Sequence, residues 1–347
     1  MSIRAAIIGP TGYAGFHLVQ LLLRHPATRI TYLASRRDDP PNLAAEFPQL
    51  LGCLPEHELA CRPIDPQAIA RAADVVFLAL PHRASMAIAP RLLNEGVKVI
   101  DLSADYRLKS AELYEQTYQT RHDDPTNLAA AVYGLPELFR EQIPSASLIA
   151  TPGCYPTAAA LSIAPLLAAG LVEPAGILIN AATGVTGAGK SPKPQYHFPE
   201  LNEAYAPYGV IGGHRHQPEI VQTLSHVCDD DIGVLFVPHL VPIDRGILET
   251  IYLDPVDEKL TQNDLYEALE DACQHEPFIR IRTDLPNVKH VRDSNFCDIA
   301  LRLVSDARGD RKVLLFSAID NMIKGTSGQA IQCMNLMFHQ PETAGLL

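Results

Sequence analysis

One cysteine, Cys154, lies where a thiol is suited to nucleophilic chemistry. It belongs to the segment Thr151-Pro152-Gly153-Cys154-Tyr155-Pro156-Thr157, which opens the apolar run 158–171. Pro156 fits the first turn of a helix, because that turn does not use its backbone N–H. We therefore expect the thiol beside unpaired backbone donors and the positive end of a helix dipole, which lower the pKa of a cysteine and favour the thiolate. The alternative is a small buried hydrophobic residue, as most cysteines are.

Two histidines flank an arginine in the segment Gly212-Gly213-His214-Arg215-His216-Gln217-Pro218-Glu219. In an extended segment His214 and His216 face the same side, and Glu219 could orient one imidazole if a helix begins near Pro218. We predict no metal site, because the chain has no C-x-x-C, its seven cysteines are scattered, and no local cluster supplies the further ligands of zinc. The histidines are therefore candidates for proton transfer.

The amino-terminal segment has the order that a dinucleotide site requires. An apolar strand is predicted over 3–8, a glycine turn follows, and a helix then carries several leucines on one face. Gly9 allows the tight turn, Gly12 lets the backbone approach a pyrophosphate, and Gly15 permits close packing of helix on strand. The spacing is G-x-x-G-x-x-G. The predicted cofactor-binding residues of this turn are Gly9, Thr11, Gly12, Tyr13, Ala14 and Gly15.

The end of the second predicted strand, 29–34, decides which nicotinamide cofactor is preferred. Ser35 and Arg36 follow this strand directly. A hydroxyl and a guanidinium suit the 2′-phosphate of NADP, whereas an NAD site usually has an acid that binds the ribose hydroxyls. The competing residues are Asp38 and Asp39, which lie a few residues beyond the predicted strand end. We predict NADP.

Two further strands, over 74–80 and 97–100, are predicted on either side of a helix around 86–93. In open α/β sheets the ligand binds beyond the carboxyl ends of the strands, so Leu80, Pro81 and the segment 103–107 should line the crevice. Ser103 and Arg107 are the candidates there for an anionic ligand. The alternative for Arg107 is a surface ion pair with Asp105 or Glu112.

A nicotinamide-type fold, a helix-capped cysteine and a histidine pair together indicate a thioester-forming aldehyde dehydrogenase. Cys154 would attack an activated acyl group, and a histidine would manage the protons. Hydride from NADPH would then convert the thioester to a thiohemiacetal that releases an aldehyde. A thioester accepts hydride more readily than the oxygen ester that serine would form.

Eight segments in order along the whole chain are similar to those of one family. They are Gly9–Gly15, Leu78–His82, Asp101–Arg107, Tyr133–Glu137, Ala150–Thr157, Gly184–Lys190, Gly213–His216 and Lys324–Ala330. The chain resembles the longer form of the N-acetyl-gamma-glutamyl-phosphate reductase family, which is related to the aspartate-semialdehyde dehydrogenases. We find no departure at a position that we regard as essential.

The resemblance implies NADPH-dependent reduction of N-acetylglutamyl 5-phosphate to N-acetylglutamate 5-semialdehyde, with release of phosphate. It implies that Cys154 is the nucleophile. We choose His216 as the acid and base, with His214 stabilising the oxyanion or holding the substrate, and the sequence alone does not separate these two roles. Its small anionic substrate makes arginines candidate ligands, because guanidinium groups match phosphate and carboxylate geometry. The substrate-binding candidates are Ser103, Arg107, Lys190, Arg215 and Glu219, and the further cofactor-binding candidates are Gly187 and Asn321.

The predicted fold class is α/β, a Rossmann-type NADP-binding domain with an α+β catalytic and assembly domain like that of glyceraldehyde-phosphate dehydrogenase. We place the first domain at 1–150 with 321–347, and the second at 151–320. The second should hold a separate mixed sheet covered by a helix over 262–273. Its strands are predicted at 177–180, 232–237, 247–252, 296–302 and 313–317. The resemblance implies assembly to a homotetramer or homodimer; the alternative is a solvated outer face.

Composition agrees with this interpretation. The chain has 347 residues, of which 47% are hydrophobic, enough for two domains with cores. A net charge of −12 argues against nucleic acid as a partner. The start runs straight into a predicted core strand and no apolar run is long enough to cross a bilayer, so we expect neither a signal peptide nor a membrane span. The odd number of scattered cysteines indicates a cytoplasmic protein.

Three other functions remain open from the residues. A sister reductase acting on aspartyl phosphate or aminoadipyl phosphate would keep the cysteine and histidine and change the carboxylate ligands. A Cys-His acyl hydrolase would use the same pair, and the glycine segment would then be an ordinary turn. A dinucleotide-sensing regulator would use Cys154 only for packing. NADPH binding and turnover distinguish these classes.

Overall fold

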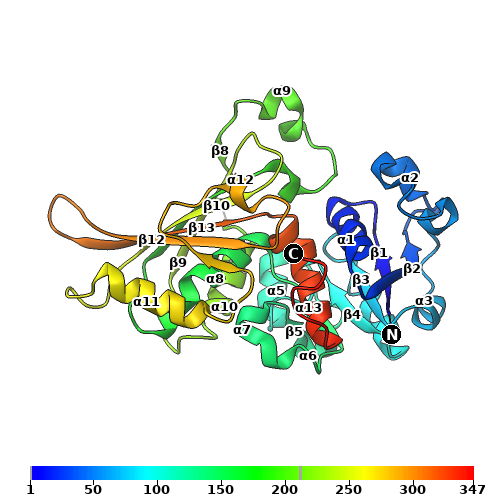
Figure 1. The fold of residues 1–347 in the computed structure, drawn as a ribbon, viewed down its shortest axis with the longest axis horizontal. Coiled ribbons are helices and arrows are strands. Elements are labelled where there is room, and N and C mark those ends of the chain that lie inside the picture. The colour runs from blue at the N-terminus through cyan, green and yellow to red at the C-terminus, as the bar shows by residue number, and fades with distance from the viewer. Residues whose placement is uncertain (1, 211–212) are drawn as a thin grey trace. The chain divides into compact units, whose positions relative to one another are not determined.

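The computed structural model describes residues 2–210 and 213–347, and the chain divides into two compact units (Figure 1). Unit 1 comprises Met1–Pro152 and Thr326–Leu347, and unit 2 comprises Gly153–Gly325. The sequence-based boundaries were residues 150 and 321, so the segment 321–325 packs with unit 2 instead of unit 1. Each unit has its own sheet and its own buried core.

Unit 1 is built on a six-stranded sheet of order β2-β1-β3-β4-β6-β5, in which every paired strand is parallel. Ile8 pairs with Ala34 and with Leu78, and Leu78 pairs with Asp101, so these strands end at one edge of the sheet. That edge is where open parallel sheets bind ligands. The strands are β1 (Ile3–Ile8), β2 (Thr28–Ala34), β3 (Val75–Leu78), β4 (Lys98–Asp101), β5 (Val132–Tyr133) and β6 (Leu148–Ala150).

Helices pack beside this sheet, and α1 also contacts the C-terminal helix α13. Strand β1 has the predicted bounds, whereas the helix expected around 86–93 begins only at Ala89. The reason is a side chain distant in sequence, because the backbone N–H groups of Ser85 and Met86 bind the carboxylate of Asp105. The α-helices of unit 1 are α1 (Tyr13–Arg24), α2 (Leu43–Glu46), α3 (Pro66–Ala72), α4 (Ala89–Asn94), α5 (Ala111–Tyr118), α6 (Pro125–Ala130), α7 (Pro136–Phe139) and α13 (Gly328–Met337).

Unit 2 is built on a mixed seven-stranded sheet of order β11-β12-β13-β10-β7-β9-β8. All five predicted strands are present, and most extend two or three residues further than predicted. A β-strand can continue past its apolar run because hydrogen bonding to its neighbours does not depend on side-chain type. The strands are β7 (Ile177–Thr183), β8 (Ala206–Pro207), β9 (Val234–Leu240), β10 (Ile247–Leu253), β11 (Ile279–Ile281), β12 (Cys297–Ser305) and β13 (Arg311–Ile319).

One face of this sheet is covered by α8 (Cys154–Ala168), which contacts β10, β12 and β13 as well as α10 (His216–Leu224) and α11 (Gln262–Cys273). Helix α11 has the predicted bounds, because Thr261 and Asp264 form a reciprocal capping box at its start. Two short helices, α9 (Phe198–Leu201) and α12 (Val288–Val291), lie in connections. Among the described residues, none of the helices has the length and apolar character needed to span a membrane.

A buried carboxyl group, Glu249 on β10, supports a stability prediction. Its side chain is fully buried, and its two oxygen atoms have no hydrogen-bond partner among the described residues. Burial raises the pKa of Glu249 well above its ordinary value of 4.5. The folded state therefore holds a proton that the unfolded state releases, so this group lowers stability as the pH rises above that ordinary value.

Glu249→Gln is expected to raise the free energy of unfolding at neutral pH, by an amount that grows as the pH increases above about 4.5. Chemical denaturation at several pH values measures this difference. The exposed Glu258→Gln serves as a control for loss of one negative charge and should leave stability nearly unchanged. A difference between wild type and Glu249→Gln that does not depend on pH would contradict the prediction.

Candidate active site

Cys154 is the first residue of α8, as the sequence predicts, and Gly153 is the N-cap of that helix. The thiol is half-buried. The backbone approaches closely here, because a Cβ atom built on Gly325 would lie 2.7 Å from the Cβ of Cys154. Because Cys154 is the first residue of a fifteen-residue helix, the positive end of the helix dipole lies at this thiol, a setting that favours thiolate.

Glu219 belongs to α10 (His216–Leu224), and its carboxylate reaches the start of α8. Its side chain is 1% exposed, and its Oε1 accepts a hydrogen bond of 2.7 Å from the backbone N–H of Gly153. The sequence predicted that Glu219 could orient an imidazole or contact the substrate. The structure shows it bound to the backbone that carries the cysteine, where it satisfies one of the free N–H groups of the helix end.

The two histidines lie side by side, as predicted, but not in an extended segment. Their ring centroids are 4.8 Å apart with an interplanar angle of 76°, and both rings contact Tyr155. Arg215 between them has helical dihedral angles, and α10 begins at His216, two residues before Pro218. The side chains meet because the chain turns into the helix at this point. Gly212, at the start of the predicted segment, lies outside the described residues.

His214 is fixed by its neighbours. Its Nδ1 accepts a hydrogen bond of 3.1 Å from the backbone N–H of His216, so the neutral ring carries its proton on Nε2. Burial, with a smaller effect of the Arg215 charge, lowers the pKa of His214 to about 4. Gly209 has a φ of +62°, and a Cβ atom there would lie 2.8 Å from the His214 ring. His214 is therefore a neutral hydrogen-bond donor at physiological pH.

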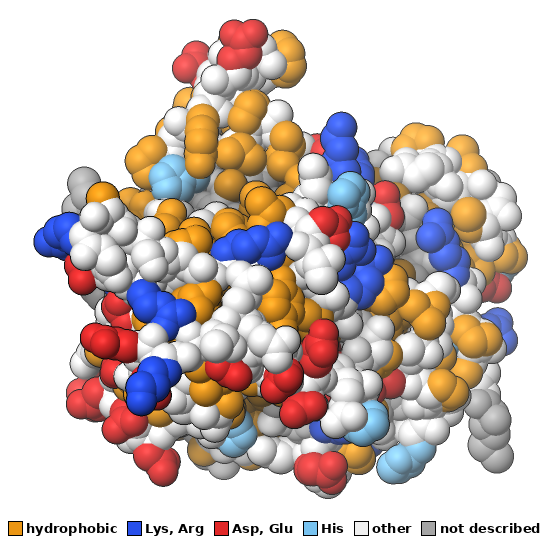
Figure 2. All heavy atoms as spheres, turned by 60° about the vertical axis from the view of Figure 1, so that its left-hand side comes forward, with side chains coloured by type: hydrophobic (Ala, Val, Ile, Leu, Met, Phe, Trp, Pro, Cys, Tyr) orange, Lys and Arg blue, Asp and Glu red, His pale blue; other side chains and the backbone are white. Residues whose placement is uncertain are grey.

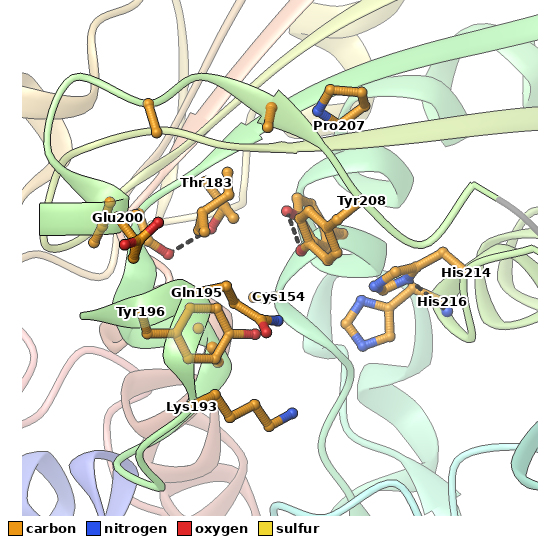
Figure 3. Close-up of a pocket in the computed structure, with 18 of the residues that line it drawn as sticks. Cys154, Thr183, Lys193, Gln195, Tyr196, Glu200, Pro207, Tyr208, His214 and His216 are labelled. Carbon is orange, nitrogen blue, oxygen red and sulfur yellow. Dashed lines mark hydrogen bonds between the residues drawn. The ribbon is translucent and has the colours of Figure 1, made fainter. Parts of the chain in front are cut away.

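Cys154, His214, Arg215 and His216 share one cavity of about 410 Å³ within unit 2 (Figure 3). The structure thus brings the predicted nucleophile, both predicted histidines and one predicted arginine to a single site. Tyr155 and Tyr208 also line it, and their hydroxyl oxygens are 2.7 Å apart.

The sequence analysis did not identify the opposite wall of this cavity. It comes from the segment 193–208, of which Lys193, Gln195, Tyr196 and Glu200 lie across the cavity from the histidines (Figure 3), whereas Tyr208 contacts His214. The proline and aromatic content of this stretch indicated only a loop, and spacing gave no sign that it returns to the cysteine. The residues that line the cavity from this segment are Lys193, Gln195, Tyr196, Glu200, Leu201, Ala204, Ala206, Pro207 and Tyr208.

The glycine-rich segment 184–189 lies at another side of the cavity, which Gly184, Gly187 and Ala188 line. Asn321 holds this segment, because its amide donates to Thr186 Oγ1 (3.1 Å) and accepts from the backbone N–H of Gly246 (2.7 Å). The segment is therefore anchored at its middle. Lys190, beyond it, is exposed and does not belong to the described cavity lining.

The predicted dinucleotide turn lies at the carboxyl end of β1 in unit 1. Gly9 has a φ of +88°, and Gly15 packs so closely that a Cβ atom there would lie 2.4 Å from the Gly9 carbonyl oxygen. Gly12 is the N-cap of α1, and a Cβ atom there would have its nearest described neighbour at 3.9 Å. The space before this helix end is open to a phosphate group. Thr11, Tyr13 and Ala14 are half-buried around it.

Ser35 and Arg36 follow β2 directly, because that strand ends at Ala34 as predicted. Arg36 is exposed, and the Ser35 hydroxyl accepts a hydrogen bond from the backbone N–H of Arg37. Asp38 and Asp39 lie beyond the end of the strand, also exposed. The strand tip thus presents a hydroxyl and a guanidinium before any acid. At the end of β3, Leu80 is buried and Pro81 is exposed.

Arg107 and Ser103 are buried in the loop that follows β4. Arg107 is 6% exposed, and it donates from Nε to the Thr151 carbonyl (2.8 Å) and from Nη2 to the Leu102 carbonyl (3.1 Å). The alternative of a surface ion pair does not hold, because this guanidinium is not at the surface. Two backbone carbonyls fix its plane.

Comparison with known proteins defines the class of this chain as semialdehyde dehydrogenase. The family model "Semialdehyde dehydrogenase, NAD binding domain" matches residues 4–146, and "Semialdehyde dehydrogenase, dimerisation domain" matches residues 154–321. Aspartate semialdehyde dehydrogenase II from Vibrio cholerae has a TM-score of 0.70 at 17% identity, over 98% of this chain and 99% of that one. The enzyme with NADP from Candida albicans has a TM-score of 0.71 at 17% identity, over 97% and 99%. These likenesses confirm the predicted fold class.

Sequence comparison places the chain within this class. N-acetyl-gamma-glutamyl-phosphate reductase of Symbiobacterium thermophilum is 47% identical over 100% of this chain and 98% of that protein. The reductases of Citrifermentans bemidjiense and Geotalea daltonii are 44% and 45% identical, each over 99% of this chain and 98% of the relative. The chain belongs to the N-acetyl-gamma-glutamyl-phosphate reductase family, which confirms the resemblance seen in its motifs.

Proposed function

We propose that this chain catalyses the NADPH-dependent reduction of N-acetyl-L-glutamyl 5-phosphate to N-acetyl-L-glutamate 5-semialdehyde in arginine biosynthesis, with release of phosphate. The observation that carries this proposal is a half-buried cysteine at the start of α8 in the same cavity as two histidines, in a chain 47% identical to a curated reductase over its full length. A thiol at a helix N-terminus beside imidazoles is the arrangement that thioester chemistry needs.

The chain's own residues divide the work as follows. The Cys154 thiolate attacks the acyl carbon, a C–S bond forms, and the C–O bond to phosphate breaks, leaving a thioester. His216 takes the thiol proton in the first step and returns a proton in the reductive step. The neutral His214 donates from Nε2 to the oxygen that becomes negative. The thiohemiacetal then gives its hydroxyl proton back to His216 as its C–S bond breaks, which releases the aldehyde and restores the thiolate of Cys154.

NADP fits the turn of unit 1 that Gly12 begins, because the open space before α1 and the N–H groups of this helix end suit a pyrophosphate. Bound there, NADPH supplies the hydride that reduces the thioester. Gly9, Thr11, Tyr13, Ala14, Gly15, Leu80 and Pro81 of unit 1 are proposed to shape the remainder of this cofactor site. Gly187 and Asn321 of unit 2 stay candidates for contact with the nicotinamide. The candidates for the anionic substrate are Arg107 and Ser103 of unit 1, and Arg215 and Lys190 of unit 2. Glu219 is better assigned to holding the Gly153 backbone than to an anion.

Arg36→Ala is expected to lower kcat/KM for NADPH by about 10–100-fold while leaving the value for NADH nearly unchanged. A hydrogen bond to a charged group contributes roughly 1.5–3 kcal/mol, and each 1.4 kcal/mol is about tenfold. Steady-state kinetics with both cofactors measure the ratio. Arg37→Ala is the matched control, since Arg37 pairs with Glu46 and should have the smaller effect. Equal losses with both cofactors would contradict the assignment of the 2′-phosphate to Arg36.

We also infer that the chain forms a homotetramer or homodimer in the cytoplasm. The outer face of the unit 2 sheet supports this, because Leu178 and Leu235 on the paired strands β7 and β9 are 43% and 55% exposed. Figure 2 shows hydrophobic side chains grouped together on the face of the molecule that it draws. A second copy would cover such an apolar face. Light scattering measures the assembly.

The function is tested most directly in the reverse direction, as phosphate-dependent reduction of NADP by N-acetylglutamate semialdehyde. Aspartate semialdehyde is added as a competing substrate. Selective turnover of the acetylated substrate supports the proposal. Preference for aspartate semialdehyde would identify a sister reductase, and phosphate-independent release of free acid would identify a hydrolase.

A further inference from the structure

A buried carboxylate, Asp105, lies beneath the loop that carries Ser103 and Arg107. It is fully buried in unit 1. Its Oδ1 accepts hydrogen bonds from the backbone N–H of Arg83 (2.7 Å) and the Tyr114 hydroxyl (3.0 Å). Its Oδ2 accepts from the backbone N–H groups of Ser85 (2.9 Å) and Met86 (3.4 Å). One side chain thus collects three backbone donors from a segment about twenty residues away.

The segment 83–86 folds around this carboxylate as backbone loops fold around bound anions. Arg83 has a φ of +73°, a left-handed conformation that a non-glycine residue rarely adopts, and it is the first of the three backbone donors. Strain of this kind persists where surrounding contacts require it. Asp105 therefore acts as an internal anion that sets the path of the chain between β3 and α4.

A second buried carboxylate, Asp101, extends the connection. Its Oδ1 accepts from the Ser85 hydroxyl (2.7 Å), and its Oδ2 accepts from the Ser103 hydroxyl (2.7 Å). The Ser103 hydroxyl in turn accepts from the backbone N–H of Asp105 (3.1 Å). Burial and the neighbouring Asp105 raise the pKa of Asp101 to about 6. Asp101 and Asp105 are thus buried close together despite the repulsion between their charges, and their hydrogen bonds join the segment 83–86 to the loop 101–107.

This network continues to Arg107. The carbonyl of Leu102 accepts a hydrogen bond from Nη2 of Arg107, and the carbonyl of Thr151 accepts one from its Nε. Thr151 is itself held by the carbonyl of Asp101, which accepts from its backbone N–H (2.9 Å) and its hydroxyl (3.0 Å). The two carbonyls that fix the guanidinium plane thus come from Leu102, which follows Asp101 in the chain, and from Thr151, which is hydrogen-bonded to the main chain of Asp101.

We propose that Asp105 is a positioning residue, which clamps the segment 83–86 to the loop 101–107 and thereby fixes Arg107 and Ser103 for an anionic substrate. This inference rests on the proposed function for the role of Arg107, and on the described hydrogen bonds alone for the clamp. Asp105 itself contacts neither substrate nor cofactor in this scheme.

Asp105→Asn tests the clamp with little change in volume. Each carboxylate oxygen of Asp105 accepts hydrogen bonds from two donors. In Asp105→Asn the amide NH₂ group, itself a donor, therefore faces two other donors in either orientation of the side chain. We expect KM for phosphate in the reverse reaction to rise by at least about tenfold, because a displacement of about 1 Å at a positioned group can cost about 10²-fold. The control Asp74→Asn removes an acid of the same unit that pairs with Arg4 and should leave KM unchanged.

Rescue separates positioning from a general loss of structure. Asp105→Gly leaves the three backbone donors facing a space of carboxylate size, and added formate should lower its elevated KM for phosphate without affecting the wild type. Should the Asp105 variants fail to fold, Tyr114→Phe removes the side-chain hydroxyl that donates to Asp105 and is expected to raise KM for phosphate in the same direction. An unchanged KM in folded Asp105→Asn, or in Tyr114→Phe where that variant replaces it, would overturn the proposal.

Hydrogen exchange at the backbone amides of 83–86 measures, in the absence of substrate, whether these amides stay hydrogen-bonded. Loss of protection in Asp105→Asn, confined to this segment and the loop 101–107, is the expected result. Protection equal to that of the wild type would overturn the clamp even if the enzyme is active. The two proposals can fail separately. If the wild type does not turn over N-acetylglutamate semialdehyde, but Asp105→Asn loses protection at 83–86 and 101–107 relative to the wild type, the proposed function is overturned and the clamp is supported.

Discussion

Replacing Cys154 with serine is expected to lower turnover by about 10⁴-fold or more, with the fold and NADP binding retained. The loss is large because the nucleophile acts in both chemical steps, and removal of a nucleophile commonly costs this much. A serine hydroxyl is ionised far less than a thiol at a helix N-terminus, and its ester accepts hydride poorly. Initial rates in the reverse assay measure the effect.

Two controls keep this result specific to the thiol. Cys53→Ser changes an exposed cysteine of unit 1 and should leave turnover unchanged. Mass spectrometry of the intact protein, after mixing with acyl phosphate without cofactor, should show an acyl adduct on the wild type and none on Cys154→Ser. Undiminished turnover in Cys154→Ser would refute the thioester mechanism.

Substitution of the two histidines is expected to separate their roles. His216→Asn should lower kcat by about 10²–10⁴-fold and flatten the pH profile of kcat, because general acid–base catalysis contributes about this much. His214→Asn should lower kcat by about 10²–10³-fold, the effect of removing one donor to an oxyanion. Its pH profile above about 5 should keep the shape of the wild type, because the pKa of His214 is lowered to about 4 and the ring is already neutral.

The measurement is kcat as a function of pH for both variants, with His275→Asn as an exposed control. The roles would be reversed if His214→Asn lost the pH dependence and His216→Asn kept it. Near-normal rates in both variants would remove the histidine pair from the mechanism. Circular dichroism checks the start of α10, because the His214 Nδ1 accepts the backbone N–H of His216 there.

The parts of the molecule that local sequence determines were predicted well. β1 and α11 have the predicted bounds, because an apolar strand before a glycine turn and a capping box are signals within a few residues. The position of Cys154 at a helix start follows in the same way from Gly153 and Pro156. The two histidines were also expected on one side, but from an extended segment, whereas they meet because the chain turns into α10 there.

The remainder depends on residues far apart in the chain. The late start of α4 follows from Asp105, about twenty residues away, and no spacing reveals that contact. The bond from Gly153 to Glu219 joins residues 66 positions apart, so the sequence could only place Glu219 near a histidine. The cavity wall 193–208 was missed for the same reason, since its return to the cysteine is a property of the fold.

The cavity of unit 2 has a consequence for how such an enzyme can diverge. The proposed nucleophile Cys154 and the proposed base His216 are the first residues of two packed helices, α8 and α10, and Glu219 of α10 accepts a hydrogen bond from the N-cap residue of α8. The facing wall comes from one segment of the chain, 193–208, which lies between β7 and α10 in the sequence. Under the proposed function, we expect substitutions in the part of this segment that faces the histidines, such as Lys193 or Tyr196, to change the choice of acyl chain more than the rate of the chemical steps. Most of the residues that would select the acyl chain thus lie in a different segment from those that would carry out the chemistry, and Tyr208, which contacts His214, is the exception.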